Sequence, residues 1–335
     1  MQEISIENNS AVCRMEKCGR QMQINAKTAY AKQKPWFDKA KDRGGFYVTY
    51  QFLKYEALEG VLTVTLSRPE KLNAMSLAMC REILDALDQA EMDDSVRVII
   101  FTGEGRGFCS GTDLTADNSF DYTDVNPMEH RDEGGLIALR IYKMKKPTIA
   151  AINGAAMGVG ITMTLPMDIR IASDQAKMGF VFARRGIVNE AASSFFLPKL
   201  VGIAKSLEWA LSGRMVLPEE ALACGLVNKV CPAETLLEEA NRMAQEIANN
   251  TSAVSVALVR QLFWKNLSAV HPMEAHEQES LILQWIGSQE DAQEGLLAFQ
   301  EKRTPQFAMT VSQDLPEFYS SLWKHRNFRN ANCNG

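Results

Sequence analysis

The stretch PTIAAINGAAMGVGITMTLPMDIRIAS, residues 147–173, sets the fold class of this chain. Residues 147–167 carry no charge and approach the length of a membrane span. Several residues in this run break a membrane helix, namely Asn153, Gly154, Gly158, Gly160 and two prolines. We therefore predict a buried strand over 148–153, a glycine turn, a short buried helix from about Val159 and a second strand over 167–173.

Strands and helices continue to alternate before this stretch. A strand over 60–69 ends at Pro69, Ser76 caps a helix, a continuous apolar strand covers 96–103, and a helix covers 134–145. Strands that alternate with helices form parallel sheets with right-handed crossovers. The sequence therefore predicts the α/β fold class.

Beyond about Ser193 the pattern is almost entirely helical. Helices are predicted over 203–212, 218–224, 233–250, 252–268, 272–287 and 289–301, with one strand-like segment over 226–231. The predicted domains are a polar, flexible N-terminal extension over 1–50, an α/β core over 51–250, a C-terminal helical region over 251–307 and a tail over 308–335. A targeting role for the extension is the alternative, against which its acidic residues speak.

Composition indicates a globular protein and excludes several classes of partner. The chain is 46% hydrophobic and 23% charged, with a net charge of −5 and basic residues interleaved with acids. Nucleic acid is therefore not expected as a partner. The seven cysteines include no CxxC pair and the four histidines show no ligand spacing, so reduced thiols and no metal site are expected. We expect a cytoplasmic protein, with mitochondrion and peroxisome as alternatives.

Two glycine-bearing loops follow predicted strands. In FCSGTDL (108–114), Gly111 lets the N–H of Thr112 approach a ligand. In NGAAMGVG (153–160), the N–H groups near Val159 open a helix. Neither loop matches a dinucleotide fingerprint or a P-loop, and each alone is an ordinary tight turn. Together, two N–H groups from separate loops can bind one oxygen that becomes negative, which is an oxyanion hole.

Glu190, in RRGIVNEAASS, is a carboxylate downstream of both loops. A lone carboxylate beside an oxyanion hole can move a proton and form an enolate from an activated acyl group. Its apolar neighbours are expected to raise its pKa, namely Phe180, Phe182, Ile187, Phe195 and Phe196. From the residues alone, an acid in the first turn of a helix is an equal alternative.

Six motifs follow one another in a recognisable order. They are SRPEKLNAMS (67–76), FCSGTDL, the strand–NGAAMGVG–helix segment, GIVNEAASSFFLPKLVG (186–202), the stretch over 211–230 and FQEKRTPQF (299–307). In this order the chain resembles the crotonase, or enoyl-CoA hydratase/isomerase, superfamily over about residues 53–307. The resemblance implies a spiral of ββα units whose C-terminal helices trimerise, giving a homotrimer or hexamer. It also implies an acyl-CoA thioester, in which coenzyme A enters as part of the substrate and no separate cofactor is needed.

The resemblance also assigns residues. Thr112 and Val159 match the two oxyanion N–H donors. The residues that match the lining of the CoA and acyl channel are Lys71, Leu72, Ala74, Ser110, Gly111, Asp113, Leu114 and Gly158. Phe299 and Lys302 match a C-terminal helix that reaches the nucleotide end of CoA in many relatives, although an exposed helix charge is the alternative for Lys302. Asp113 is expected to brace its loop, and Cys109 to be a small buried thiol.

The two glutamates of the well-known hydratases are absent, since their positions hold Thr162 and Phe182. Glu190 instead matches the base of relatives that shift a double bond from C3 to C2. The leading hypothesis is an enoyl-CoA isomerase with Glu190 as its single acid and base. A hydratase or dehydratase of an unusual acyl-CoA and a non-catalytic acyl-CoA-binding protein are the alternatives. The acids that are expected to be merely solvated are Asp117, Asp121, Asp124 and Glu133.

Overall fold

The computed structural model describes residues 39–42, 45–115, 123, 126 and 129–323. The chain forms two compact units, residues 1–49 and 50–335. The first unit contains an antiparallel hairpin of β1 (Lys39–Asp42) and β2 (Gly45–Val48), which the sequence did not predict. Residues 1–38 of the predicted extension and 324–335 of the predicted tail lie outside the described residues, as do Asp117, Asp121 and Asp124.

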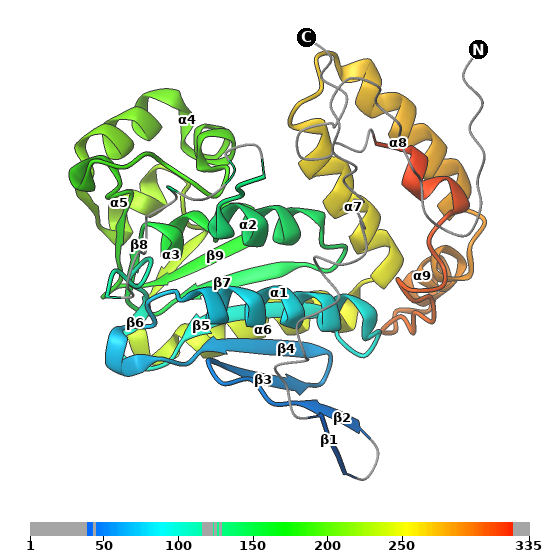
Figure 1. Cartoon of the computed structure of the whole chain (residues 1–335). Helices are drawn as coiled ribbons and strands as arrows, with labels where there is room; N and C mark the ends of the chain where they lie inside the picture. Colours follow the sequence, from blue (N-terminus) through cyan, green and yellow to red (C-terminus); the bar gives the residue numbers. More distant parts are fainter. Residues whose placement is uncertain (1–38, 43–44, 116–122, 124–125, 127–128, 324–335) are drawn as a thin grey trace, which may run out of the picture. The chain divides into compact units, whose positions relative to one another are not determined.

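A six-stranded sheet forms the larger layer of the second unit (Figure 1). Its strands, in spatial order, are β12 (Lys229–Cys231), β9 (Ile169–Ser173), β7 (Thr148–Ile152), β5 (Val98–Gly103), β4 (Val61–Leu66) and β3 (Leu53–Leu58). All neighbours are parallel except β3, which runs antiparallel to β4. Every residue of β5 and β7 is buried, because both faces of these central strands are covered.

One face of the large sheet packs against α6 (Leu236–Asn250). The helix presents a stripe of small residues one turn apart, Ala240, Ala244 and Ala248, to strand residues such as Ile100 and Ile149. This spacing lets the helix approach the sheet closely and bury β-branched side chains.

A second sheet of four short strands completes the core. Its order is β11 (Met215–Val216), β10 (Lys177–Gly179), β8 (Ala155–Met157) and β6 (Gly107–Cys109). Successive strand pairs β5–β6, β7–β8 and β9–β10 each place their first strand in the large sheet and their second in the small one. The chain therefore winds as a spiral of ββα units, which confirms the predicted fold class.

The predicted helices are present, with one difference in α4 (Ser193–Ser212). The sequence predicted a helix only from residue 203, whereas the structure has helical turns on both sides of Gly202, whose φ of 77° breaks the helix. The remaining helices of the core are α1 (Leu77–Met92), α2 (Glu133–Lys143), α3 (Val159–Thr162) and α5 (Pro218–Ala223).

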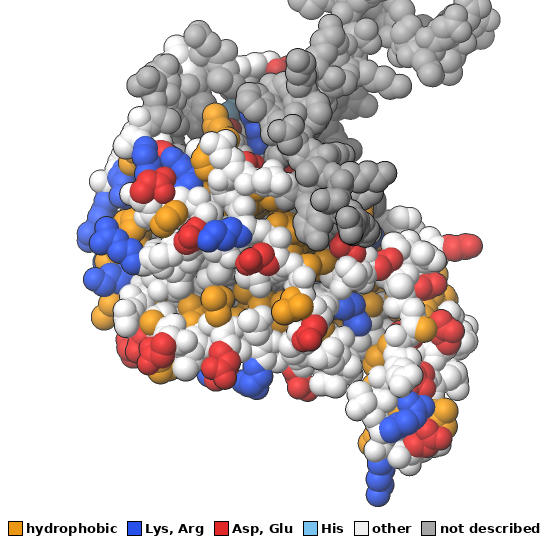
Figure 2. Space-filling model, turned by 90° about the horizontal axis from the view of Figure 1, so that it is seen from below, with side chains coloured by type: hydrophobic (Ala, Val, Ile, Leu, Met, Phe, Trp, Pro, Cys, Tyr) orange, Lys and Arg blue, Asp and Glu red, His pale blue; other side chains and the backbone are white. Residues whose placement is uncertain are grey.

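The C-terminal helices are α7 (Ala253–Asn266), α8 (Pro272–Ile286) and α9 (Glu290–Glu301). Part of the predicted tail packs against them, since Met309 joins a buried cluster with Val254 and Leu258 of α7 and Ile282 of α8. Within the described part of the chain, no helix combines the length and apolar composition that crossing a membrane requires. On the face shown in Figure 2, hydrophobic side chains form small areas separated by acidic and basic ones.

Candidate active site

A pocket of about 1110 Å³ lies where the chain leaves β6 and β8. Its walls come from five segments, residues 75–80, 110–114, 129–134, 158–159 and 181–190, which are far apart in the sequence. The carboxyl ends of parallel strands are where α/β proteins bind ligands. The volume is that of a pocket for a ligand of cofactor size.

The loop after β6 turns the N–H group of Thr112 away from Met75, with which Thr112 forms an isolated parallel bridge. Met75 N donates to Gly111 O at 2.8 Å, and Asp113 N donates to Met75 O at 2.9 Å. These two hydrogen bonds use the carbonyl group of Gly111 and the N–H group of Asp113, which flank Thr112. The N–H group of Thr112 therefore points away from Met75. Gly111 has a φ of 103°, a conformation that favours glycine.

The loop after β8 provides a second N–H group. Gly158, with a φ of 53°, donates its N–H to Gly179 O at 3.0 Å and opens α3 at Val159. As the first residue of a helix, Val159 has no carbonyl within the helix for its N–H. Val159 and Thr112 line the same pocket, so two backbone donors from separate loops are available to an oxygen bound there. Because α3 has only four residues, its dipole adds little to this pair.

Glu190 lies in a segment without regular secondary structure directly before α4. The helix begins at Ser193, so Glu190 does not belong to its first turn, and that alternative interpretation is wrong. Ala191 and Ala192 follow with φ values of 56° and 51°, a left-handed conformation that non-glycine residues rarely adopt. Consecutive strained residues beside a carboxylate in a pocket are typical of a functional site.

The start of α2 packs directly against the Glu190 carboxyl group. A Cβ added to Gly134 would lie 1.8 Å from Glu190 Oε2, so only glycine leaves room for this carboxyl position. Asp132 Oδ1 caps α2 by accepting the N–H of Gly135, and it also accepts the N–H of Ala191 at 3.1 Å. On the other side, Glu190 Oε1 lies 2.5 Å from the hydroxyl oxygen of Thr162.

This environment makes Glu190 a weak acid. Burial raises its pKa to about 7, and the nearby carboxylates of Asp132 and Glu133 contribute in the same direction, while the hydrogen bond from Thr162 opposes them. Near neutral pH, both protonation states are therefore populated. A group that must both take up and release a proton works best under that condition.

Asp113 shows the opposite behaviour in the same pocket. Thr115 donates to its Oδ1 at 2.6 Å, Arg68 lies 2.9 Å from its Oδ2 and Lys71 lies 3.4 Å from it. These hydrogen bonds, that of Thr115 first, hold the pKa of Asp113 well below its usual range. Asp113 is therefore a permanently charged brace of the loop.

Comparison with known proteins agrees with this architecture. The sequence model of the enoyl-CoA hydratase/isomerase family matches residues 56–310. The chain belongs to the enoyl-CoA hydratase/isomerase family. It is 44% identical over 260 residues to an enoyl-CoA hydratase of Alternaria alternata, covering 77% of this chain and 86% of the relative. It is 33% identical over 266 residues to 1,2-epoxyphenylacetyl-CoA isomerase of Escherichia coli, covering 77% and 98%.

Solved structures give the same result. The crystal structure of a probable enoyl-CoA hydratase/isomerase from Mycobacterium abscessus superimposes with a TM-score of 0.72 at 31% identity, covering 76% of this chain and 98% of that one. A monofunctional enoyl-CoA isomerase from M. smegmatis superimposes with a TM-score of 0.58 at 32% identity, covering 68% and 99%. The predicted family and the predicted class of enzyme are confirmed. Since both hydratases and isomerases are among the relatives, the comparisons do not separate these two reactions.

Most of the predicted site residues come together in this family member. Those that line the pocket are Ser110, Gly111, Thr112, Asp113, Leu114, Gly158, Val159 and Glu190. Lys71, Leu72 and Ala74 lie just outside the lining, where Lys71 contacts Asp113 and Leu72 O accepts the N–H of Ser110 at 3.0 Å. Phe299 and Lys302, in and directly after α9, do not line the pocket of their own chain, and Phe299 is 84% exposed.

Three further residues of this site were not predicted. Glu133, expected to be solvated, is half-buried and lines the pocket, and Asp132 and Gly134 beside it were overlooked. A signal was present, because the glycine pair Gly134–Gly135 in the first turn of a helix indicates a close approach. Cys109 is fully buried, and burial raises its pKa to about 12, as expected for an unreactive thiol. Among the described residues, no group of three or more His, Cys, Asp or Glu side chains is placed to hold a metal ion.

Proposed function

We propose that this family member is an enoyl-CoA isomerase that converts a 3-enoyl-CoA into a 2-enoyl-CoA, with Glu190 as its single acid and base. The observation that carries the proposal is the Glu190 carboxyl group, half-buried in a pocket beside two available backbone N–H groups, with a pKa of about 7. The substrate is an acyl-CoA thioester, and no separate cofactor takes part.

The reaction needs one proton to leave C2 and one to arrive at C4. The Glu190 carboxylate removes the C2 proton, and the electron pair moves into the thioester to form a dienolate. The N–H groups of Thr112 and Val159 bind the dienolate oxygen, where each donor contributes about 3–4 kcal/mol to the barrier reduction. The Glu190 carboxylic acid then returns the proton at C4, and the double bond lies between C2 and C3.

A hydratase is the second candidate, and one observation favours it. Hydration requires that a water molecule is activated and that a proton is delivered to C2, which either Glu190 alone or two carboxyl groups could perform. Glu133 lines the same pocket as Glu190 and supplies a second carboxylate, although neither of the two hydratase glutamates is present at Thr162 and Phe182. The relatives at 44% identity are named as hydratases.

Transfer of a label between carbons tests the isomerase directly. A 3-enoyl-CoA that carries deuterium at C2 is incubated with the protein in ordinary water, and the product is analysed by NMR. We expect a 2-enoyl-CoA with part of the deuterium at C4, because one carboxyl group carries it from C2. In a parallel incubation with the matching 2-enoyl-CoA, formation of a 3-hydroxyacyl-CoA would support the hydratase, provided that the 3-enoyl ester is not isomerised. Binding without turnover of either ester would support a non-catalytic acyl-CoA-binding protein.

We also propose that the protein is a homotrimer or a hexamer assembled through its C-terminal helices. The support is a set of large apolar side chains in and between α7, α8 and α9 that are exposed in the single chain, namely Phe263 at 77%, Val270 at 94%, Leu283 at 70% and Phe299 at 84%. Light scattering after size-exclusion chromatography should give three or six times the chain mass of 37.3 kDa. A monomer at micromolar concentration would contradict the proposal.

Phe299 and Lys302 keep their proposed role at the nucleotide end of CoA. Because they do not line the pocket of their own chain, they can meet the nucleotide only where the ligand extends beyond that pocket. Replacement of Lys302 by Ala should raise the KM for CoA esters several-fold and leave the KM for a truncated pantetheine thioester unchanged. Equal effects on both substrates would exclude contact with the nucleotide.

A further inference from the structure

The hydroxyl group of Thr162 lies between two oxygen atoms of the active site. Its oxygen is 2.5 Å from Glu190 Oε1 and 3.1 Å from the carbonyl oxygen of Gly158. The side chain is fully buried at the end of α3. A hydroxyl group has one hydrogen atom, so it can donate to only one of these two oxygens at a time.

Each protonation state of Glu190 corresponds to one of the two directions in which the Thr162 hydroxyl group can donate its hydrogen bond. When Glu190 is ionised, the Thr162 hydroxyl donates to Oε1, and Gly158 O keeps the N–H groups of Ile161 at 3.1 Å and Thr162 at 3.0 Å. When Glu190 is protonated, its carboxylic O–H donates to the Thr162 oxygen, and the Thr162 hydroxyl donates to Gly158 O. Rotation of one hydrogen therefore satisfies both states without movement of any heavier atom.

We propose that Thr162 is the positioning residue for Glu190, because its hydroxyl group hydrogen-bonds the Glu190 carboxyl group as donor in one protonation state and as acceptor in the other. The proposal rests on the proposed role of Glu190 as acid and base, and it gives a function to a position where the hydratase glutamate is missing. A carboxyl group that is held in place while its proton comes and goes needs no reorganisation during the reaction.

The titratable groups near Glu190 act differently from this hydroxyl, and one of them, the Asp132 side chain, also hydrogen-bonds the Glu190 carboxyl group in the direction that favours its protonated form. Asp132 and Glu133 from the start of α2 are acids that disfavour the Glu190 carboxylate, whereas Thr162 favours it. Cys80 from α1 and Cys109 from β6 remain neutral thiols, since burial raises the pKa of each to about 12. The remaining titratable side chains of the pocket wall are Asp113, Glu129, His130, Arg131 and Arg185.

Three variants test the proposal by two readouts. Thr162→Val keeps the shape of the side chain and removes the hydroxyl, and Thr162→Ser restores it. Thr164→Val is the matched control, because Thr164 is also fully buried and its hydroxyl donates to Ile161 O at 2.8 Å without contacting Glu190. The readouts are the pH profile of kcat/KM for a 3-enoyl-CoA and the NMR titration of the Glu190 carboxyl carbon, assigned with Glu190→Gln.

Loss of the hydroxyl should destabilise the ionised form of Glu190. In Thr162→Val we expect the Glu190 titration and the acidic limb of kcat/KM to move upward by about one pH unit. We also expect kcat to fall about tenfold while KM stays nearly constant. Thr162→Ser should return both readouts to wild type, and Thr164→Val should change neither.

Two outcomes would overturn the proposal. One is a Thr162→Val enzyme with the wild-type titration, and the other is an equal shift in Thr164→Val, which would indicate a general packing effect. If Thr162→Val does not fold, Thr162→Ser and Thr162→Ala carry the same comparison. Failure of the proposed function is distinguishable, because Glu190→Gln would then retain activity while the NMR titration still reports the Thr162–Glu190 contact.

Discussion

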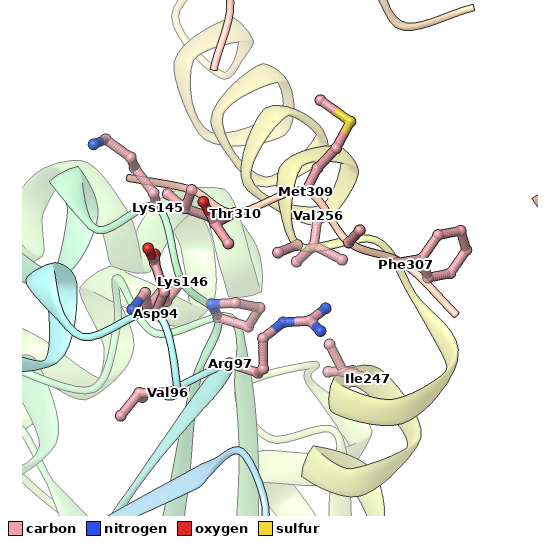
Figure 3. Close-up of a pocket in the computed structure, with 14 residues that line it drawn as sticks. Asp94, Val96, Arg97, Lys145, Lys146, Ile247, Val256, Phe307, Met309 and Thr310 are labelled. Carbon is pink, nitrogen blue, oxygen red and sulfur yellow. The ribbon is translucent and has the colours of Figure 1, made fainter. Parts of the chain in front are cut away.

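The pocket around Glu190 lies where the chain leaves β6 and β8 of the small sheet, whereas the cavity around Lys146 lies before β5 and β7 of the large sheet. The cavity has a volume of about 160 Å³ (Figure 3). Lys146 is 3% exposed, and its Nζ donates to Ala90 O at 2.7 Å and to Asp93 O at 2.5 Å. Arg97, whose guanidinium group points into the cavity, donates to Thr251 O at 2.6 Å.

Burial works against the charged form in both regions, but the neighbours differ. Burial lowers the pKa values of Lys146 and Arg97, while backbone carbonyls and nearby acids favour their charge. Around Glu190, burial and the acids Asp132 and Glu133 all disfavour the charge, and Thr162 opposes them. The charges of Lys146 and Arg97 are compensated by their neighbours, so these residues stabilise the fold. The charge of Glu190 is not compensated in this way, so its carboxyl group is ready to exchange a proton.

Replacement of Glu190 should show most strongly that the pocket around Glu190 serves activity rather than stability. In Glu190→Gln we expect kcat to fall by about 10²- to 10⁴-fold, because the acid and base is lost. The free energy of unfolding at pH 8 should stay equal or rise, since a buried charge is removed. Steady-state kinetics and urea unfolding measure both. Full activity of this variant would remove Glu190 from the mechanism.

The pH dependence of stability should reveal the same carboxyl group. The folded pKa of Glu190 is about 7, above its ordinary value of 4.5, so the native state binds more protons than the unfolded state between these values. Its contribution to stability is present below about pH 4.5 and is lost as the pH rises through 7. The difference between wild type and Glu190→Gln should change by about 3 kcal/mol across this window. A constant difference would show that the Glu190 pKa is not raised.

Gly134 should be required for activity and not for folding. The Cβ of Gly134→Ala would lie 1.8 Å from Glu190 Oε2 and would displace the carboxyl group, so we expect kcat to fall about 10²-fold. Gly295→Ala in α9 is the control, because its Cβ has no neighbour closer than 3.6 Å. That variant should keep wild-type kinetics. An active Gly134→Ala enzyme would mean that Glu190 need not occupy its present position.

Lys146 should be required for stability and not for activity. Lys146→Met keeps the chain length but leaves Ala90 O and Asp93 O without their donor, so unfolding should become easier by about 2 kcal/mol. The control Lys145→Met removes a more exposed ion pair with Glu91 and should cost under about 1 kcal/mol. Both variants should keep kcat within about twofold of wild type. A loss of activity in Lys146→Met without a loss of stability would reverse the roles of the two regions.

The sequence predicted the parts of the fold that depend on local pattern. The central strands are continuous apolar runs because helices or other layers cover both faces, and that burial is visible in residues 98–103 and 148–152. The three-residue strands β6, β8 and β10 were not predicted, because they form by pairing between segments about 20 to 50 residues apart. The turns of α4 before Gly202 were not predicted either, since the predicted helix began at residue 203.

The sequence predicted only those residues of the candidate site that are marked by their own loop or position in the chain. Glu190, Thr112 and Val159 were found from loops and position, and all three line the pocket. The roles of Asp132, Gly134 and Thr162 depend on contacts with Glu190 and Ala191 across 28 to 59 positions of sequence, which no local pattern records. Glu133 was predicted to be solvated because its stretch has the character of a variable loop, and the fold places it, half-buried, at the start of α2 in the pocket wall.

Mass spectrometry of the products formed in oxygen-18 water from matched 3-enoyl- and 2-enoyl-CoA esters decides between the two reactions, with wild type and Glu190→Gln compared. We expect the wild-type enzyme to move the double bond of the 3-enoyl ester without any gain in mass, and Glu190→Gln not to do so. A labelled 3-hydroxyacyl-CoA, or double-bond migration at the full rate by Glu190→Gln, would contradict the proposed isomerase mechanism.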